Sequence, residues 1–332
     1  SRRFGGYISN KSDLVRVSNP FAEQSYVSYQ SSSNQKLYPS FDSLNALSLC
    51  PWIVNKDILD LVIGLFQSGG NTDLSVPLDE SKMSTKMPVL QENASKADRI
   101  LYNKEKKRYD QKRREMYSLW RDCLYRLSIA NHFRDRIFWF PHNMDFRGRT
   151  YPIPPHFNHL GADLASSLLL FAKGRPLGDK GLDWLKLHLI NLVGNMKNSP
   201  LSERLDYANS ILHLEILDSA DNPWDGRRWW TKNENPWQVL ACCKEIARAI
   251  RSLDHRNYVS HFPVHQDGSC NGLQHYAALG RDLGGALAVN LVPCEKPQDV
   301  YARVVEIVEA MRLRDAEKGN KLAIMLEGFI QR

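Results

Sequence analysis

A short stretch, His265 to Tyr276, constrains the fold of this chain most, because it places one carboxylate between an apolar segment and a turn with two glycines. Phe262 and Val264 alternate with other residue types, which predicts a strand that ends just before Asp267. A carboxylate at a strand end can hold Mg²⁺, and Gly268 can bring its backbone carbonyl to the same ion because it has no Cβ. Beyond the second glycine the apolar spacing is helical, so the unit is predicted as strand, tight turn and helix.

The same residues also fit an ordinary buried turn in which Asp267 caps the following helix. A zinc site is a third interpretation, because four histidines flank Asp267, namely His255, His261, His265 and His275. Its ligand spacing is poor, since His261 and His265 on one strand would lie about 13 Å apart at ~3.3 Å per residue. The magnesium site and the buried turn therefore remain the two interpretations of these residues.

The string Asp-Gly-Ser-Cys-Asn-Gly-Leu-Gln-His-Tyr at 267–276 closely resembles motif A of the single-subunit, phage-type RNA polymerases. Residues 141–152 resemble the Asp-x-x-Gly-Arg element of that family, and 181–188 and 297–301 resemble further segments in the same order. The residues of these segments resemble the mitochondrial members of the family more closely than the phage members. Similarity runs from about Gly5 to Arg332 and is weakest over 68–98.

This resemblance implies a right-hand polymerase fold of the α+β class, mostly helical and incomplete in this chain. The implied domains are the end of an N-terminal region, a thumb with a mobile loop at 68–98, a palm that carries motif A, and the start of the fingers, over residues 1–50, 51–135, 136–285 and 286–332. The first residue is Ser1 and the last residues still follow a helical pattern. The chain is therefore expected to be an internal segment of a longer polymerase.

The implied activity is DNA-templated RNA synthesis in the mitochondrial matrix. In that reaction the RNA 3′-hydroxyl attacks the α-phosphate of a ribonucleoside triphosphate with the help of two Mg²⁺ ions. The resemblance makes Asp267 the catalytic metal ligand and Gly268 a second, carbonyl ligand. The family's other metal-binding Asp belongs to a later motif, so the active site is expected to be incomplete here. Implied partners are template DNA, the RNA transcript and mitochondrial transcription initiation factors.

Three residues are expected to bind the nucleotide, again by resemblance. Lys197 follows a predicted helix and would reach the triphosphate, although a lysine that only solvates a helix end is an alternative. Tyr301, in the first turns of a predicted helix, would contact the ribose, and a buried packing role is its alternative. Arg332 matches the first basic residue of the family's next motif.

Arg147, Arg149 and Tyr151 are expected to contact template or RNA. Guanidinium groups fork onto phosphates, a tyrosine ring can stack on a base or sugar, and Gly148 lets the backbone come close. The alternative is a purely structural pair between Asp145 and an arginine under the turn.

Charge supports a polyanionic partner without specifying it. The chain carries 44 Lys and Arg against 37 Asp and Glu, a net charge of +7 and a pI near 9.0. Residues 104–114 contain seven basic side chains and two acidic ones, on a long helix predicted from Arg99 to Ala130. This run is either a clamp on the nucleic-acid backbone or a solvated helix face.

Apolar periodicity predicts the remaining elements. Helices are expected over 58–66, 164–172, 181–193, 201–217 and 237–250 and from near Pro297, a strand over 137–140, and a turn at Gly284-Gly285. The tryptophans between 224 and 237 form either a stacking platform or, as is commoner, part of a core. The six cysteines contain no C-x-x-C pair, which predicts free thiols, and no apolar run reaches the roughly 18 residues of a membrane span, so no membrane insertion is expected.

Two rival functions fit parts of the pattern. A DNA polymerase of the same right-hand superfamily would incorporate deoxynucleotides, and a non-catalytic nucleic-acid-binding module would bind without metal-dependent chemistry.

Overall fold

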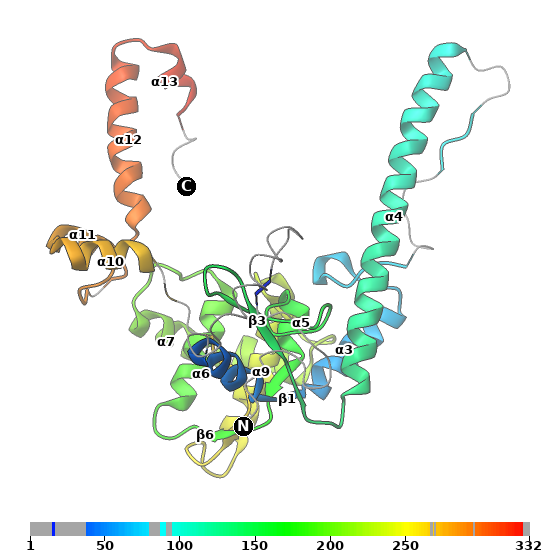
Figure 1. The fold of residues 1–332 in the computed structure, drawn as a ribbon, viewed down its shortest axis with the longest axis vertical. Coiled ribbons are helices and arrows are strands. Elements are labelled where there is room, and N and C mark those ends of the chain that lie inside the picture. The colour runs from blue at the N-terminus through cyan, green and yellow to red at the C-terminus, as the bar shows by residue number, and fades with distance from the viewer. Residues whose placement is uncertain are drawn as a thin grey trace. The chain divides into compact units, whose positions relative to one another are not determined.

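The computed structural model describes residues 15–16, 38–79, 87–90, 95–265, 268, 270–294 and 296–327. The chain divides into two compact units, the first made of Ser1–Leu185 with Leu212–Pro263 and the second of Lys186–Ile211 with Val264–Arg332. Helices predominate and the strands are short (Figure 1), which confirms the predicted α+β, mostly helical class.

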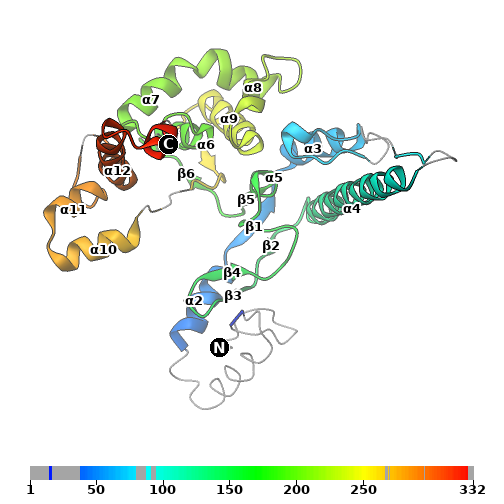
Figure 2. The same ribbon diagram turned by 90° about the horizontal axis from the view of Figure 1, so that it is seen from above.

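The sheet of the first unit has three antiparallel strands in the order β2-β1-β5 (Figure 2). The central strand β1 (Pro51–Val54) places Trp52 opposite Phe138 of β2 (Phe138–Trp139) and opposite Phe171 of β5 (Leu169–Phe171). The helix predicted over 164–172 is wrong in its second half. Helix α5 (Asp163–Ser167) is short, and the residues after it join β1 because that strand offers free backbone partners and aromatic contacts.

Helix α9 (Pro236–Arg251) forms the centre of the first unit, and most of its residues are buried. Trp237 and Trp230 are fully buried, with ring centroids 5.2 Å apart, so these two tryptophans belong to the core, as expected. Trp224 and Trp229 are half-buried. The indole N–H of Trp237 donates to the carbonyl of Leu74 at 2.7 Å. Before α9 lie a 3₁₀ turn (Trp229–Lys232) and, further back, the π-helical turn Leu212–Ile216 with α8 (Leu217–Asp221).

The segment from 68 to 79 is packed rather than loose. Helix α3 (Lys56–Gln67) is followed by Gly69 and Gly70, both with positive φ, and then by the 3₁₀ turn Thr72–Leu74. Leu74 and Val76 are buried. The prediction of a mobile loop over 68–98 is therefore wrong for residues 68–79, because two of their apolar side chains are buried in the core. Residues 80–86 and 91–94 lie outside the described residues.

Helix α4 (Lys96–His132) is long and continuous, as predicted (Figure 1). It begins at a capping box in which Ser95 and Asp98 exchange side-chain and backbone hydrogen bonds. Its C-terminal half is buried at Cys123, Leu127 and Ala130. A preceding α-helix, α2 (Tyr38–Ser48), buries Leu44.

The described part of the first unit also contains two small antiparallel ribbons. One pairs β3 (His142–Met144) with β4 (Thr150–Pro152), and the other pairs β6 (Arg175–Pro176) with β7 (Val259–Ser260). The predicted strand through Phe262 and Val264 is wrong, since β7 ends at Ser260. Pro263 has no N–H for a ladder, which favours an early end.

The second unit begins inside helix α6 (Gly181–Val193), which has the predicted bounds. Helix α7 (Leu201–Ser210) ends where a single helix over 201–217 was predicted to continue. No helix among the described residues combines the length and the apolar character that a membrane crossing requires.

Four further helices follow among the described residues of the second unit, namely α10 (Asn271–Gly280), α11 (Leu283–Ala288), α12 (Val300–Glu317) and α13 (Lys321–Met325). A small core of Ala277, Ala286 and Val289 joins α10 to α11. The predicted turn at Gly284-Gly285 is wrong, because both glycines lie inside α11. Helix α13 packs on α12 (Figure 1), where the guanidinium of Arg312 donates to the carbonyl of Ala323 at 2.8 Å.

Candidate nucleotide and nucleic-acid binding sites

Two predicted site residues, Asp267 and Arg332, lie outside the described residues. Gly268 is described and exposed. A Cβ added at Gly268 would come within 2.7 Å of the Asn271 side-chain oxygen, so the backbone is held close to the start of α10. An aspartate carboxylate and a glycine carbonyl are oxygen donors of the kind Mg²⁺ prefers, so this donor set fits the predicted ion.

The helix that begins within motif A is fixed by its neighbours. Cys270 precedes α10 in the left-handed region with φ 58°. The side-chain amide of Gln274 donates to the carbonyl of Val289 at 2.8 Å, which joins α10 to the end of α11. The turn that carries Gly268 is thereby attached to a packed pair of helices.

Residues before motif A contact helix α6 within the second unit. The imidazole of His265 lies edge to face with that of His188, with ring centroids 5.4 Å apart. Burial, and then the nearby His265, lower the pKa of His188 to about 4, so His188 is neutral at pH 7. Sequence reasoning missed His188, although a histidine on a largely apolar helix was a visible signal.

Lys197 lies where the sequence predicts it, just past the end of α6. Gly194 ends that helix with φ 84°, and residues 195–198 form turns in which the Lys197 side chain is exposed. The position is confirmed, and the contact of Lys197 with a nucleotide is untested.

Arg204 of α7 holds this turn and was missed by sequence reasoning. Its guanidinium donates to the carbonyl of Lys197 at 2.8 Å, to the carbonyl of Ser199 at 2.9 Å and to the side-chain oxygen of Asn191 at 2.7 Å. The backbone around Lys197 is thus hydrogen-bonded to the helix that follows it.

Tyr301 lies in the first turn of α12, as predicted. Asp299 caps this helix by accepting a hydrogen bond from the Tyr301 N–H at 2.9 Å. Tyr301 is 70% exposed in the described part of the second unit, so the alternative of a buried packing tyrosine is wrong there. Just before Asp299, Asn290 and Gln298 exchange two hydrogen bonds of 2.6 Å, which closes the loop that leads into α12.

The turn between β3 and β4 is organised by Asp145. One carboxylate oxygen accepts from the N–H groups of Arg147 and Arg149, both at 2.9 Å. The other accepts from the Arg147 guanidinium at 3.1 and 3.2 Å and from the Tyr151 hydroxyl at 3.3 Å. The structural Asp–Arg pair considered from the sequence is therefore real, and it engages Arg147.

The electrostatics of this turn distinguish its two arginines. Desolvation acts to raise the pKa of Asp145, but the hydrogen bonds from Arg149 and Arg147 prevail and lower it, so Asp145 stays ionised. Arg149 is exposed, and among the described residues its guanidinium has no ion-pair partner. The Arg16 guanidinium lies 5.4 Å from the centre of the Tyr151 ring, which adds a further cation to this surface.

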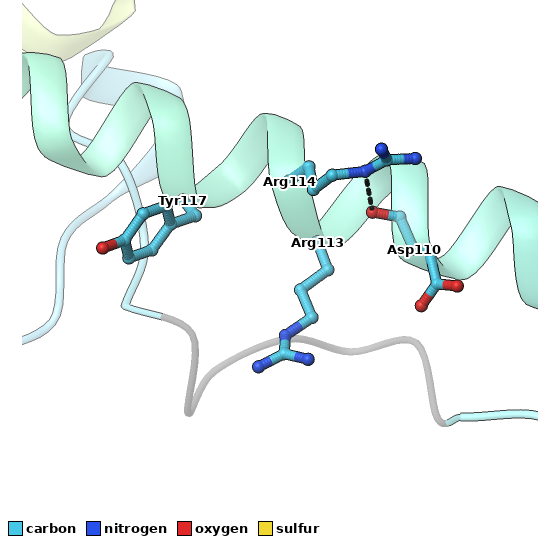
Figure 3. Close-up of a pocket in the computed structure, with 4 residues that line it drawn as sticks. All are labelled: Asp110, Arg113, Arg114 and Tyr117. Carbon is cyan, nitrogen blue, oxygen red and sulfur yellow. Dashed lines mark hydrogen bonds between the residues drawn. The ribbon is translucent and has the colours of Figure 1, made fainter.

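The basic run on α4 has a defined surface around Asp110, Arg113, Arg114 and Tyr117, which line a shallow pocket (Figure 3). The Arg114 side chain folds back to donate to the carbonyl of Asp110 at 3.2 Å. Arg113 and Tyr117 project from the same side of the helix in this view. An arginine beside a tyrosine suits both phosphate contact and base stacking.

Residues 175–332 match the model of the DNA-dependent RNA polymerase family, and this part of the chain belongs to that family. The chain is homologous to mitochondrial DNA-directed RNA polymerases. It is 54% identical to the human one over 297 residues, which are 89% of this chain and 24% of that protein. It is 51% identical to the mouse one over 329 residues (99% of this chain, 27% of that protein) and 40% identical to that of Schizosaccharomyces pombe over 329 residues (99% and 28%).

The chain thus spans about a quarter of the length of these curated relatives. The family resemblance drawn from motif A and the three other segments is confirmed. The roles of the individual site residues stay predictions.

Proposed function

We propose that this chain is part of a mitochondrial DNA-directed RNA polymerase and contributes to DNA-templated RNA synthesis from ribonucleoside triphosphates. The observation that carries the proposal is the 54% identity over 297 residues with the human mitochondrial enzyme. The proposed location is the mitochondrial matrix. The proposed partners are template DNA, the transcript and initiation factors, and the proposed division of the chain into thumb, palm and fingers follows the boundaries given above.

Asp267 and Gly268 would hold magnesium through a carboxylate and a backbone carbonyl. Two Mg²⁺ ions, when bound, supply activation of the RNA 3′-hydroxyl and stabilisation of charge on the leaving pyrophosphate. The protein's contribution at this point is to fix the turn. The lack of room for a Cβ at Gly268, where one would meet the Asn271 side chain, and the Gln274–Val289 hydrogen bond support that role.

Lys197 and Tyr301 would bind the incoming nucleotide. An exposed ammonium in a turn that is held by hydrogen bonds suits a triphosphate, because little ordering remains to be done on binding. The Tyr301 hydroxyl is exposed at the capped start of α12 and is able to donate to or accept from a ribose 2′-hydroxyl. Arg332 would add a basic group from the next motif.

Arg147, Arg149 and Tyr151 would contact template or RNA, with a division of labour. Arg147 completes the turn by pairing with Asp145, which leaves Arg149 as the cation best placed for a phosphate. Tyr151 offers its ring while its hydroxyl is held by Asp145. The basic run of α4 would contact the nucleic-acid backbone without reading its sequence.

A primer-extension assay tests this function against both rivals. A complete polymerase that carries this chain is given a DNA template with an annealed RNA primer, and either ribonucleotides or deoxynucleotides. Extension with ribonucleotides is expected. Preferential extension with deoxynucleotides would indicate the DNA polymerase, and DNA binding without extension in either mixture would indicate the non-catalytic module.

A further inference from the structure

The Arg204 side chain makes three hydrogen bonds that could not be predicted from its position in the sequence. It lies in the first turn of α7, seven residues after Lys197, and its side chain is half-buried. Each guanidinium nitrogen donates to a different acceptor, as described above: two backbone carbonyls of the Lys197 turn and the side chain of Asn191 on α6. One side chain therefore joins the end of α6, the turn and the start of α7.

The helix that carries Arg204 is itself fixed to α6. The buried Lys186 of α6 donates to the side-chain oxygen of Asn209 on α7 at 2.8 Å, and Asn195 donates to the Tyr207 hydroxyl at 3.4 Å. Helix α7, which carries Arg204, is thus hydrogen-bonded both to α6 and to the turn that follows it. The turn needs such support, because Gly194 and Pro200 interrupt helical hydrogen bonding at its two ends.

We propose that Arg204 is a positioning residue for Lys197, an inference that rests on the proposed contact between Lys197 and the nucleotide triphosphate. By accepting a hydrogen bond from Arg204, the Lys197 carbonyl is fixed, and the direction in which the Lys197 side chain leaves the backbone is fixed with it. The ammonium is then presented with its turn already ordered. Arg204 itself touches no substrate in this account.

The geometry requires an arginine. A lysine at 204 would keep the positive charge but has one terminal nitrogen, which cannot reach three acceptors spread over Asn191, Lys197 and Ser199. Arg204→Lys is therefore the informative variant, because it removes the fork and preserves the charge. Loss of two or three partly exposed hydrogen bonds is expected to raise the KM for ribonucleotides roughly tenfold and to change kcat less.

The test is a double-mutant cycle in a complete polymerase that carries this chain. The variants are Lys197→Ala, Arg204→Lys and the double variant, with Arg314→Lys as a matched control on α12, where Arg314 donates to the Ala310 carbonyl of its own helix at 3.3 Å. If Arg204 acts through Lys197, the double variant has the same ribonucleotide KM as Lys197→Ala alone. Arg314→Lys is expected to behave as wild type.

Hydrogen exchange of the backbone amides of residues 195–199 gives a second measurement that does not depend on the nucleotide. Faster exchange of this turn in Arg204→Lys, with α7 still protected, is expected. The proposal would be overturned if the free-energy changes calculated from KM were additive in the double variant, or if the KM of Arg204→Lys were unchanged. An unchanged KM in Lys197→Ala would overturn the triphosphate contact itself, and faster exchange in Arg204→Lys would then show that only the link to the nucleotide had failed.

Discussion

Removal of the Asp163 carboxylate is expected to destabilise the first unit through helix α9. Asp163 accepts hydrogen bonds from the backbone N–H groups of Trp237 at 2.8 Å and Gln238 at 3.0 Å, and from the Gln238 side chain at 3.1 Å. These two backbone donors belong to the first turn of α9 and have no partner within the helix. A residue 74 positions away in the sequence thus caps the central helix of the core.

Two opposed effects set the size of the change. Burial raises the pKa of Asp163 above its ordinary value of 3.8, and the hydrogen bonds from Gln238 and Trp237 only partly counter it. In Asp163→Ala the cap is lost and two partly buried donors remain unpaired, which costs about 2 to 3 kcal/mol in the free energy of unfolding. Asp163→Asn keeps a neutral acceptor and avoids the buried charge, so its cost is expected to be below about 1 kcal/mol.

The pH dependence has a definite sign. Because the folded pKa of Asp163 lies above the unfolded one, the folded chain binds this proton more tightly, and ionisation costs stability as the pH rises through the folded pKa. Wild type should therefore lose stability relative to Asp163→Asn as the pH rises from 3.8, the ordinary pKa, through the raised folded pKa of Asp163.

Urea unfolding followed by tryptophan fluorescence measures these changes, since Trp237 and Trp230 are buried beside the cap. The expected order of stability at pH 7 is wild type close to Asp163→Asn, and Asp163→Ala clearly lower. A free energy of unfolding for Asp163→Ala within about 0.5 kcal/mol of wild type would refute the reasoning. So would an Asn variant less stable than the Ala variant.

Three further predictions concern binding in a complete polymerase that carries this chain. Lys197→Ala should raise the KM for ribonucleotides, because a triphosphate contact present before chemistry contributes ground-state binding, and an unchanged KM with an unchanged kcat in steady-state kinetics would contradict it. Arg149→Ala should weaken binding to a primed template in a fluorescence titration and leave the free energy of unfolding of the first unit nearly unchanged, whereas equal losses from a surface arginine such as Arg227→Ala would remove the assignment. Replacing four basic residues of α4 by Gln (Lys106, Lys107, Arg113 and Arg114) should weaken the salt dependence of duplex binding. The slope of log K against log salt should fall by about 0.9 for each phosphate that the helix no longer neutralises, and an identical slope would mean that this face contacts only solvent.

Local periodicity was sufficient for the long helices and insufficient for the short strands. Helices α4, α6 and α9 carry apolar residues at three-to-four spacing over many turns, so their type and approximate bounds followed from the sequence. The run after Ser167 is equally apolar, but it becomes strand β5 because β1, more than a hundred residues earlier, pairs with it. Such pairing leaves no trace in a local pattern.

The candidate site divides in the same way. Lys197 and Tyr301 were selected by resemblance to the polymerase family, and both lie beside helix ends, as predicted. Arg204 and the His188–His265 contact were not predictable, because a guanidinium bound to backbone carbonyls and a packed imidazole pair depend on how two segments meet in space. The pairing of Asp145 was predictable in part. Its partners are close in sequence, so a pair with an arginine was expected, but that the guanidinium is that of Arg147 and not of Arg149 depends on the geometry of the turn.

The most direct test of the central claim is the rate of ribonucleotide transfer by Asp267→Asn in a complete polymerase that carries this chain. Asn keeps the size of the side chain and removes the negative charge, so a metal ligand is weakened while contacts to template phosphates are kept. A loss of roughly 4 kcal/mol of metal-assisted stabilisation predicts a rate lower by about a thousandfold, with template binding unchanged and with Asp315→Asn, an exposed aspartate of α12, behaving as wild type. Transfer within about tenfold of wild type would contradict the assignment of Asp267 as the metal-binding carboxylate.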